Sequence, residues 1–165
     1  MEIRPATTAD ADAIRAIYNF EVENSTSTFD MVPRSRSEQV DYIEQRSGAH
    51  GVLVAEIDGT VVGFGALSSY RHRCAYNTTV ENSIYVDQSA RGMGVGKALL
   101  VALIELGQER GFHTIVAYIA GVEGPSVALH RSCGFRIVGV QQEVGRKFGN
   151  WLDVTVMQLM LGAGR

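Results

Sequence analysis

The hydrophobic and polar residues of this chain alternate in some segments, as in β-strands, and recur at helical spacing in others. Residues 51–67 hold two apolar runs joined by Asp58-Gly59, a pair typical of the type I′ turn of a β-hairpin. Residues 79–86 alternate cleanly and predict a strand that is apolar on one face. The apolar face holds Val80, Ile84 and Val86, and the other face holds Glu81, Ser83 and Tyr85.

Helical spacing of the apolar residues appears in four segments. Thr8 can cap the first helix, and residues 35–38 have the pattern of a capping box that opens the second. The third is a long amphipathic helix that ends at Gly111, and the fourth is a short helix between Pro125 and Gly134. The apolar stripe of the third helix consists of Val95, Leu99, Ala102, Leu103 and Leu106.

Further strands are predicted near both ends of the chain. Residues 2–6 fit an edge strand, because Pro5 would be poorly tolerated in a central one. The other predicted strands are residues 113–119, 136–144 and 152–161, with a loop at residues 145–151 between the last two. The order of elements predicts an α/β protein with a hairpin-rich first half, rather than a regular alternation of strand and helix.

Composition and charge narrow the class of protein. A length of 165 residues favours one domain, which we place at residues 1–165. The net charge of −3 gives no general reason to expect binding to nucleic acid or to an anionic membrane. The two cysteines are far apart and signal neither a metal site nor a disulfide framework. No secretory signal or membrane-spanning apolar run is visible, so a cytoplasmic location is the default expectation.

A glycine-rich stretch, residues 90–100, follows a predicted strand and opens the long helix. The Rossmann fingerprint fails because Lys97 or Leu99 stands where its third glycine is required. A Walker A motif fails because Arg91 and Ala98 stand where it needs a glycine and a Ser or Thr. Successive backbone N–H groups at a helix N-terminus can still bind an anion, although the glycines could also serve only a tight turn.

The spacing Arg91-x-x-Gly94-x-Gly96 resembles the pyrophosphate-binding motif of the GNAT N-acetyltransferases, which grips acetyl-CoA. The resemblance covers nearly the whole chain. Within the family it is strongest to the phosphinothricin and methionine sulfoximine N-acetyltransferases, and three segments carry it, residues 17–30, 75–86 and 143–159. It implies the GNAT fold, a mixed central sheet flanked by helices, whose splayed central strands form the acetyl-CoA cleft.

The resemblance also implies which residues hold the cosubstrate. The end of the predicted strand would pair with the pantetheine arm, and the glycine-rich stretch would cover the pyrophosphate. The implied contacts are Val86, Asp87, Gln88, Arg91, Gly92, Met93, Gly94, Val95, Gly96, Lys97, Ala98, Leu99 and Ser126. One departure is Glu123, which stands where relatives often carry an asparagine that helps to hold the cofactor.

Two residues are candidates for acid–base chemistry. Glu81 matches the family's general base, which takes a proton from the acceptor ammonium. His130 matches the position of a residue thought to protonate the departing thiolate, and imidazole titrates near neutral pH. The alternatives are a solvated strand carboxylate and a structural histidine. No metal is implied.

The acceptor pocket is less well marked. The α-carboxylate of an amino acid analogue needs Arg or Lys, and Arg73 and Lys147 are the preferred pair, with Arg71 also available. Phe29, Tyr76 and Asn77 would line the pocket, although each could be an ordinary exposed loop residue. Trp151 is expected in the core or at a subunit interface, because similar proteins are commonly homodimers.

The leading hypothesis is an acetyl-CoA-dependent N-acetyltransferase that acts on the α-amine of a small amino acid analogue, by direct attack in a ternary complex. Methionine sulfoximine, methionine sulfone and phosphinothricin are the substrates that the resemblance implies. A second hypothesis keeps the enzyme but changes the acceptor to a protein N-terminus or a polyamine. A third is a non-catalytic module that binds acyl-CoA.

Overall fold

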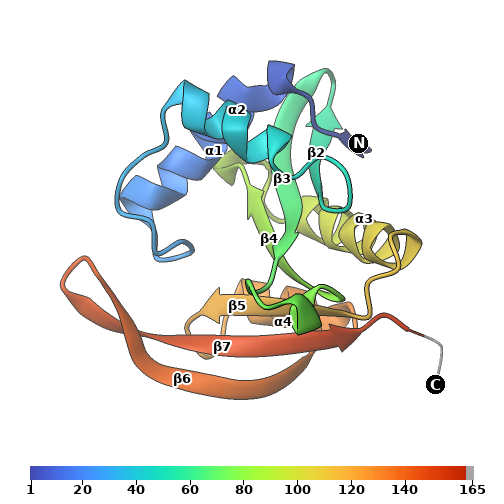
Figure 1. Cartoon of the computed structure of the whole chain (residues 1–165). Coiled ribbons are helices and arrows are strands. Elements are labelled where there is room, and N and C mark those ends of the chain that lie inside the picture. Colours follow the sequence, from blue (N-terminus) through green and yellow to red (C-terminus); the bar gives the residue numbers. More distant parts are fainter. Residues whose placement is uncertain (163–165) are drawn as a thin grey trace.

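The computed structural model describes residues 1–162, and its elements form one mixed sheet with helices packed on it (Figure 1). The strands lie in the order β1-β2-β3-β4-β5-β7-β6. Their bounds are β1 Glu2–Pro5, β2 Gly51–Ile57, β3 Thr60–Ser69, β4 Thr79–Val86, β5 Thr114–Ala120, β6 Arg136–Lys147 and β7 Asn150–Met160. The helices are α1 Ala11–Asn24, α2 Arg36–Glu44, α3 Val95–Glu109 and α4 Pro125–Ser132, with short 3-10 helices η1 Thr8–Asp10, η2 Cys74–Tyr76 and η3 Gln88–Ala90. The predicted α/β class, with a mixed central sheet flanked by helices, is confirmed.

Local turn chemistry explains most of these boundaries. Asp58 and Gly59 both have positive φ, as the predicted type I′ turn between β2 and β3 requires. The capping box before α2 is also confirmed, since the Ser35 hydroxyl accepts from the Glu38 amide and the Glu38 carboxylate accepts from the Ser35 amide. The cap predicted for the first helix, Thr8, is wrong. Thr7 is the N-cap of the 3-10 turn η1, and Asp10, the last residue of that turn, is the N-cap of α1.

The predicted loop at residues 145–151 was wrong. The β6–β7 ladder continues through this segment to the pair Lys147 and Asn150, and only Phe148 and Gly149 make the turn. Both turn residues have positive φ, at 50° and 79°. A two-residue turn of this hand matches the twist of a hairpin, so the polar and glycine-rich sequence forms strand ends rather than an open loop.

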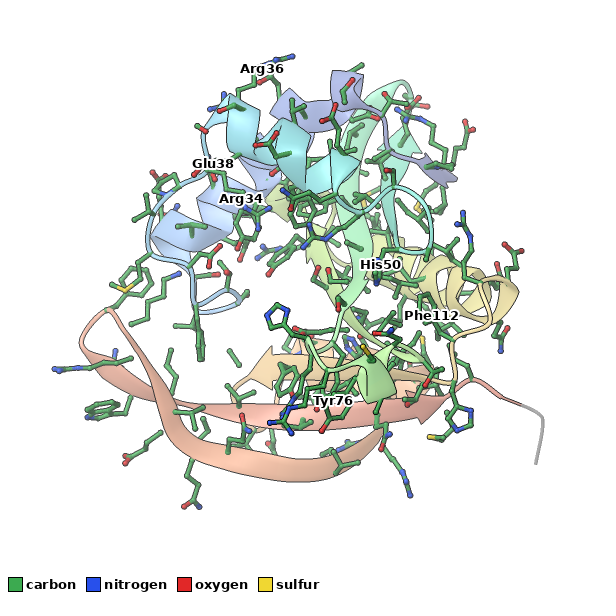
Figure 2. All side chains as sticks on the ribbon, viewed as in Figure 1. Arg34, Arg36, Glu38, His50, Tyr76 and Phe112 are labelled. Atoms are coloured by element: carbon green, nitrogen blue, oxygen red, sulfur yellow. The ribbon has the colours of Figure 1, made fainter. Side chains whose placement is uncertain are left out.

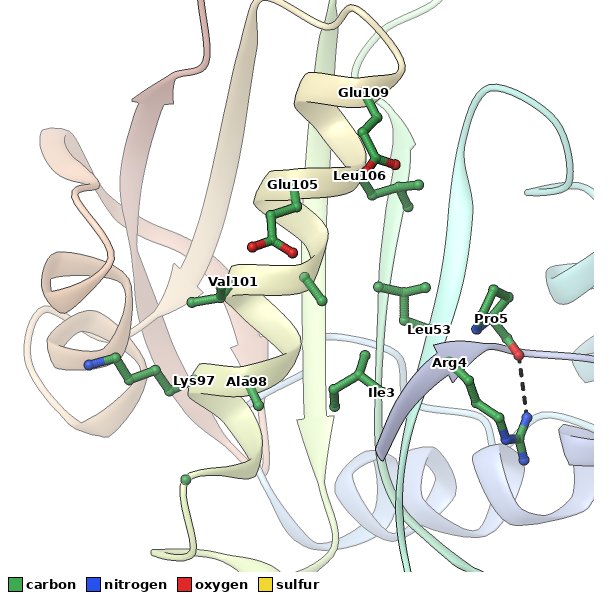
Figure 3. A pocket seen from close by; sticks show the side chains of 12 residues that line it. Ile3, Arg4, Pro5, Leu53, Lys97, Ala98, Val101, Glu105, Leu106 and Glu109 are labelled. Atoms are coloured by element: carbon green, nitrogen blue, oxygen red, sulfur yellow. Dashed lines mark hydrogen bonds between the residues drawn. The ribbon is translucent and has the colours of Figure 1, made fainter. Parts of the chain in front are cut away.

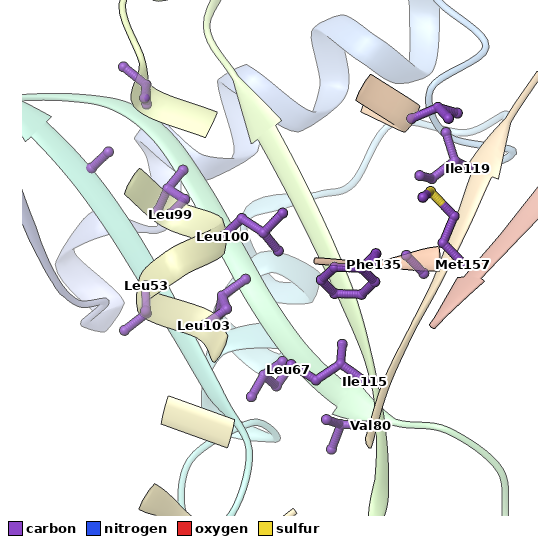
Figure 4. Close-up of a cluster of buried hydrophobic side chains, with 14 of the residues drawn as sticks. Leu53, Leu67, Val80, Leu99, Leu100, Leu103, Ile115, Ile119, Phe135 and Met157 are labelled. Carbon is purple, nitrogen blue, oxygen red and sulfur yellow. The ribbon is translucent and has the colours of Figure 1, made fainter. Parts of the chain in front are cut away.

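Two apolar clusters hold the helices on opposite faces of the sheet. On one face α3 buries Leu99, Leu100 and Leu103 against Leu67 of β3 and Ile115 of β5 (Figure 4). The cluster on the other face packs α1 and α2 over β2 and β3, and its fully buried members include Ile14, Val54 and Phe64. The β2–β3 part of the sheet is therefore covered on both sides, as its mostly apolar strands require.

The central strands separate part of the way along the sheet. β4 pairs antiparallel with β3 from Val80 to Val86. It pairs parallel with β5 only over Thr79–Glu81, opposite Thr114–Val116. Beyond Glu81 the two strands diverge, and β5 continues beside β7 while β4 stays with β3 (Figure 1). This fork confirms the predicted splay of the central strands, and it opens the backbone of both strands to a ligand.

Candidate active site

Glu81 is the last residue of β4 that pairs with β5, so its carboxylate lies at the start of the fork. Its register partner on β3 is Ser68, and directly paired residues share one face of a sheet. Arg46 reaches this point after the end of α2, where its Nε donates to the Ser68 hydroxyl over 2.9 Å. The guanidinium carbon lies 3.6 Å from the ring centroid of Tyr42, which holds it in place.

These neighbours determine the electrostatics of the carboxylate. Burial raises the pKa of Glu81 above its usual range, and the charge of Arg46 opposes that increase. Arg46 is itself partly buried, and this burial lowers the pKa of its guanidinium. A half-buried carboxylate with a raised pKa, next to the opening between two strands, has the properties of a general base.

His130 of α4 is buried on the other side of β4, and both of its ring nitrogens have partners. Nδ1 lies 2.8 Å from the Ser126 carbonyl oxygen, and Nε2 lies 2.9 Å from Nδ2 of Asn82. Phe135 packs edge-on against the ring. Burial lowers the pKa of His130, so the neutral imidazole is favoured. The role predicted for His130 as a proton donor stays a prediction, and this ring has no free nitrogen.

The glycine-rich stretch wraps the N-terminus of α3. Gly92 and Gly94 have φ of 78° and 83°, conformations that side-chain-bearing residues rarely adopt. Gly94 is the N-cap of α3 and offers no side chain to the helix, so the first-turn amides can bind an anion. Gly96 is favoured for a different reason: a Cβ at this position would lie only 3.2 Å from the Leu129 side chain of α4. Lys97 is exposed on the first turn and extends away from β1 (Figure 3).

Arg91 makes a contact that the sequence did not predict. Its guanidinium pairs with the carboxylate of Glu21 in α1, which is 4% exposed as a side chain, and also donates to the Val86 carbonyl. Ser25 donates to the second oxygen of the same carboxylate. The arginine thus fixes the entrance of the glycine-rich stretch to α1, and half of its side chain stays exposed toward solvent.

Three of the residues predicted for the acceptor lie together around η2. Arg73, Tyr76 and Asn77 are all exposed, and a cavity of about 610 Å³ is lined by Arg73 and Tyr76 together with Ser69, Tyr70, Arg71 and His72. Tyr70 stacks on Tyr118 of β5, and Tyr76 packs edge-on against Tyr70. Tyr76 therefore lies on the β5 side of the molecule, whereas Arg34 lies near α1 and α2 (Figure 2).

Phe29 and Lys147 lie on a different side of the fork, where the tip of β6 meets the segment after α1. Lys147 is buried, and its Nζ donates to the Thr28 carbonyl over 2.9 Å. Burial lowers the pKa of this ammonium group. The Phe29 ring covers Gly145 of β6. Trp151 is 59% exposed, so the core position expected as one alternative is wrong, and the interface alternative stays a prediction.

A cavity of about 740 Å³ forms a separate groove between α3 and β1 (Figure 3). Gly94 and Lys97 line one end of it, but Glu81, His130 and the predicted acceptor residues do not. Within residues 1–162 no three His, Cys, Asp or Glu side chains are grouped as a metal site would require. No helix of the described chain is long and apolar enough to cross a membrane.

Sequence analysis missed Arg46, Glu21 and Asn82. Arg46 and Glu21 gave no local signal, because each contacts a partner far away along the chain. Asn82 did give one, since it is a polar residue on the otherwise apolar face of β4. A buried polar side chain on such a face needs partners, and that requirement marks it for attention.

The fit of acetyl-CoA can be judged from groups that the protein leaves without partners. Gly94 and Gly124, the N-caps of α3 and α4, provide no side-chain cap among the described residues. The Oδ1 atom of Asn82 is buried beside the fork and has no hydrogen-bond partner in the described chain. An uncapped helix N-terminus suits a pyrophosphate, and an unpaired backbone edge suits an extended arm with amides. The residues present therefore fit the cosubstrate.

Comparisons with known proteins support this fit. A family model described as "Acetyltransferase (GNAT) domain" matches residues 3–156. An L-methionine sulfoximine/L-methionine sulfone acetyltransferase from Pseudomonas aeruginosa is 39% identical, over 99% of this chain and 96% of its own. Among solved structures, a phosphinothricin acetyltransferase from Sinorhizobium meliloti in complex with AcCoA has a TM-score of 0.96 and 38% identity, covering 99% of this chain and 89% of its own. A ribosomal-protein-alanine N-acetyltransferase from Brucella melitensis has a TM-score of 0.95 and 40% identity, covering 97% and 99%.

The fold, the fork and the uncapped helix N-terminus define an acyltransferase that takes acetyl-CoA as cosubstrate. The chain belongs to the GNAT family of N-acetyltransferases.

Proposed function

We propose that this protein acetylates the α-amine of a small amino acid analogue such as methionine sulfoximine, methionine sulfone or phosphinothricin. The observation that carries the proposal is Glu81, a half-buried carboxylate at the fork with a raised pKa. Full-length similarity to enzymes named for these substrates supports the acceptor class. The exposed cations Arg71 and Arg73 at the cavity beside Tyr76 supply charge for an α-carboxylate.

The proposed chemistry is direct transfer in a ternary complex. Bound acetyl-CoA supplies the acetyl thioester. Glu81 accepts a proton from the acceptor ammonium, either directly or through water, and the free amine then attacks the carbonyl carbon. The C–N bond forms as the C–S bond breaks, the nitrogen gives up its second proton, and the departing thiolate takes up a proton. Backbone N–H groups near Val86, on the unpaired part of β4, can stabilise the charge that develops on the carbonyl oxygen.

The proposed cofactor contacts are the predicted ones, residues 86–88, residues 91–99 and Ser126. Gly92 and Gly94 shape the anion site by their positive φ values. Glu123, the residue that departs from the family pattern, is exposed just before the N-terminus of α4. Replacing Glu123→Asn should strengthen CoA binding if this position meets the cofactor.

An acceptor screen tests the proposal. Purified protein and acetyl-CoA are incubated with methionine sulfoximine, methionine sulfone, phosphinothricin, ordinary amino acids, polyamines and peptides with alanine at the N-terminus, and free thiol is measured. The proposal expects the highest kcat/KM with an amino acid analogue. Activity confined to peptides would instead support a protein N-terminus as the acceptor, which the likeness to the Brucella enzyme favours as the second candidate.

The Glu81→Gln variant separates an enzyme from a binding module. In an enzyme the variant keeps its affinity for acetyl-CoA and loses turnover, because the amide cannot accept the proton. In a module that only binds acyl-CoA, the wild type and the variant would behave alike in every assay. Equal thiol release by both proteins would therefore reject the catalytic role of Glu81.

We also propose that the protein is a homodimer. β6 forms the edge of the sheet over twelve residues. Its exposed apolar side chains are Ile137, Val138, Val140 and Val144, and the exposed Trp151 lies on β7, the strand paired with it. Long apolar edge strands favour pairing with another chain. Light scattering after size exclusion should give twice 17.9 kDa, and Val140→Lys should shift it toward the monomer. A monomeric wild type at high concentration would refute the proposal.

A further inference from the structure

Asn82 is the first residue of β4 beyond the pairing with β5, and its side chain is buried on the face of β4 opposite to Glu81. Only 5% of the residue is exposed. Its carboxamide makes one hydrogen bond, from Nδ2 to Nε2 of His130 over 2.9 Å. The other polar atom, Oδ1, is buried with no partner in the described chain. A buried carbonyl oxygen without a donor destabilises the fold and needs an explanation.

The contacts of His130 determine which atom of the carboxamide faces the ring. The Ser126 carbonyl can only accept, so Nδ1 of His130 must carry the proton. In the neutral imidazole Nε2 is then an acceptor, and Asn82 must present its NH₂ group to it. This arrangement fixes the carboxamide in one of its two orientations, with Oδ1 directed away from His130. The side chain cannot flip without losing the bond to the ring.

From these contacts we infer that Asn82 binds the pantetheine arm of acetyl-CoA, with Oδ1 accepting a hydrogen bond from an amide N–H of the arm, and that His130 is the positioning residue that holds the carboxamide for this contact. The unpaired edges of β4 and β5 receive the arm, and Asn82 lies where that edge begins. The amides of the arm are its N–H donors, and Oδ1 can only accept. The inference deepens the proposed function, because it rests on acetyl-CoA binding at this fork.

In this arrangement the two faces of β4 serve different substrates. Glu81 faces the Arg46 side of the sheet, where it is proposed to accept a proton from the acceptor. Asn82, the next residue, faces α4 and the cosubstrate. Successive side chains of a strand point to opposite faces, so two neighbouring residues can serve two substrates at once. The Nε2 atom of His130 is then occupied in holding Asn82.

The test compares two ligands that differ in the arm. Coenzyme A and 3′-phosphoadenosine 5′-diphosphate share the nucleotide and the pyrophosphate, and only coenzyme A carries the pantetheine arm. Calorimetric titration of Asn82→Leu should show about 5- to 10-fold weaker binding of coenzyme A, the value of one hydrogen bond. Binding of the nucleotide should be unchanged. His130→Phe should weaken coenzyme A binding by a smaller factor, because Oδ1 remains but is no longer held.

A double variant controls for general damage to the fold. Asn82→Leu with His130→Phe removes both partners together, so the free energy of unfolding should return toward the wild-type value, whereas the affinity for coenzyme A should stay low. Coenzyme A affinity that recovers along with stability would show a structural role only and overturn the inference. Equal losses for the two ligands, no loss for either, or an Nε2–H tautomer of His130 by ¹⁵N NMR would also overturn it. No acceptor enters these titrations, so a failed acceptor screen would leave their result standing.

Discussion

Gly145 of β6 offers a test of the prediction that Phe29 lines the acceptor pocket, at a residue that has no functional group. A Cβ added at this position would lie 2.2 Å from Cε2 of Phe29, and 2.7 and 2.8 Å from two further ring atoms. Carbon atoms in contact normally lie about 3.5–4.0 Å apart. Gly145→Ala must therefore push the Phe29 ring outward by roughly 1.5 Å, or tilt it off the strand.

The size of the effect follows from the setting of Phe29. Inserting a methyl group into a packed core costs about 1–3 kcal/mol. Phe29 is 40% exposed and lies on a loop, so the ring can move and the cost should be near the lower end, about 1 kcal/mol. For a chain of this size that corresponds to a fall in Tm of about 2–4 °C. If Phe29 lines the acceptor pocket, as the sequence predicts, a displacement of this size should lower kcat/KM for the amino acid at least tenfold.

The assay combines thermal unfolding, acceptor kinetics and coenzyme A titration. Gly139→Ala, on the same strand, is the matched control, because a Cβ at that position would meet no atom within 4 Å. The control should leave all three measurements unchanged, and Gly145→Ala should change stability and acceptor kinetics but not coenzyme A affinity. Adding Phe29→Ala should restore the stability lost in Gly145→Ala. Wild-type acceptor kinetics in a Gly145→Ala protein with a lowered Tm would refute the assignment of Phe29 to the pocket.

Three further predictions concern charged residues. Glu81→Gln should lower kcat about 10²- to 10⁴-fold and leave the Kd for acetyl-CoA within about twofold, measured by stopped assay and calorimetry. Arg46→Gln removes the charge that opposes burial at Glu81, so the pKa of Glu81 should rise further. The acid limb of the pH profile of kcat/KM should then move to higher pH, whereas Arg46→Lys should move it less. An acid limb at the wild-type pH in Arg46→Gln would show that Arg46 does not affect the pKa of the base. Arg91→Ala leaves the buried Glu21 carboxylate without its cation, so urea unfolding should show a loss of about 1.5–3 kcal/mol, which Glu21→Gln in the same chain should partly restore.

The local sequence determined most of the elements and the cosubstrate motif. Asp58-Gly59 encodes its turn by the φ values that it tolerates, and the capping box of α2 is complete within four residues. The spacing of Arg91, Gly94 and Gly96 excluded two nucleotide motifs, because such loops depend on backbone conformation over a few neighbouring residues. The apolar stripe of α3 was also readable, since helical period and burial are linked.

Only the tertiary structure decided what meets at the fork. Arg46 reaches Ser68 beside Glu81, and Arg91 pairs with a carboxylate seventy residues earlier in the chain. Such contacts depend on how the helices pack on the sheet, and no local pattern reports them. The same holds for Lys147, which the sequence placed in an open loop and the fold buries against backbone carbonyls. The sequence therefore determined the glycine-rich loop, and the packing of distant segments determined the electrostatics of Glu81 and the surroundings of the residues predicted for the acceptor.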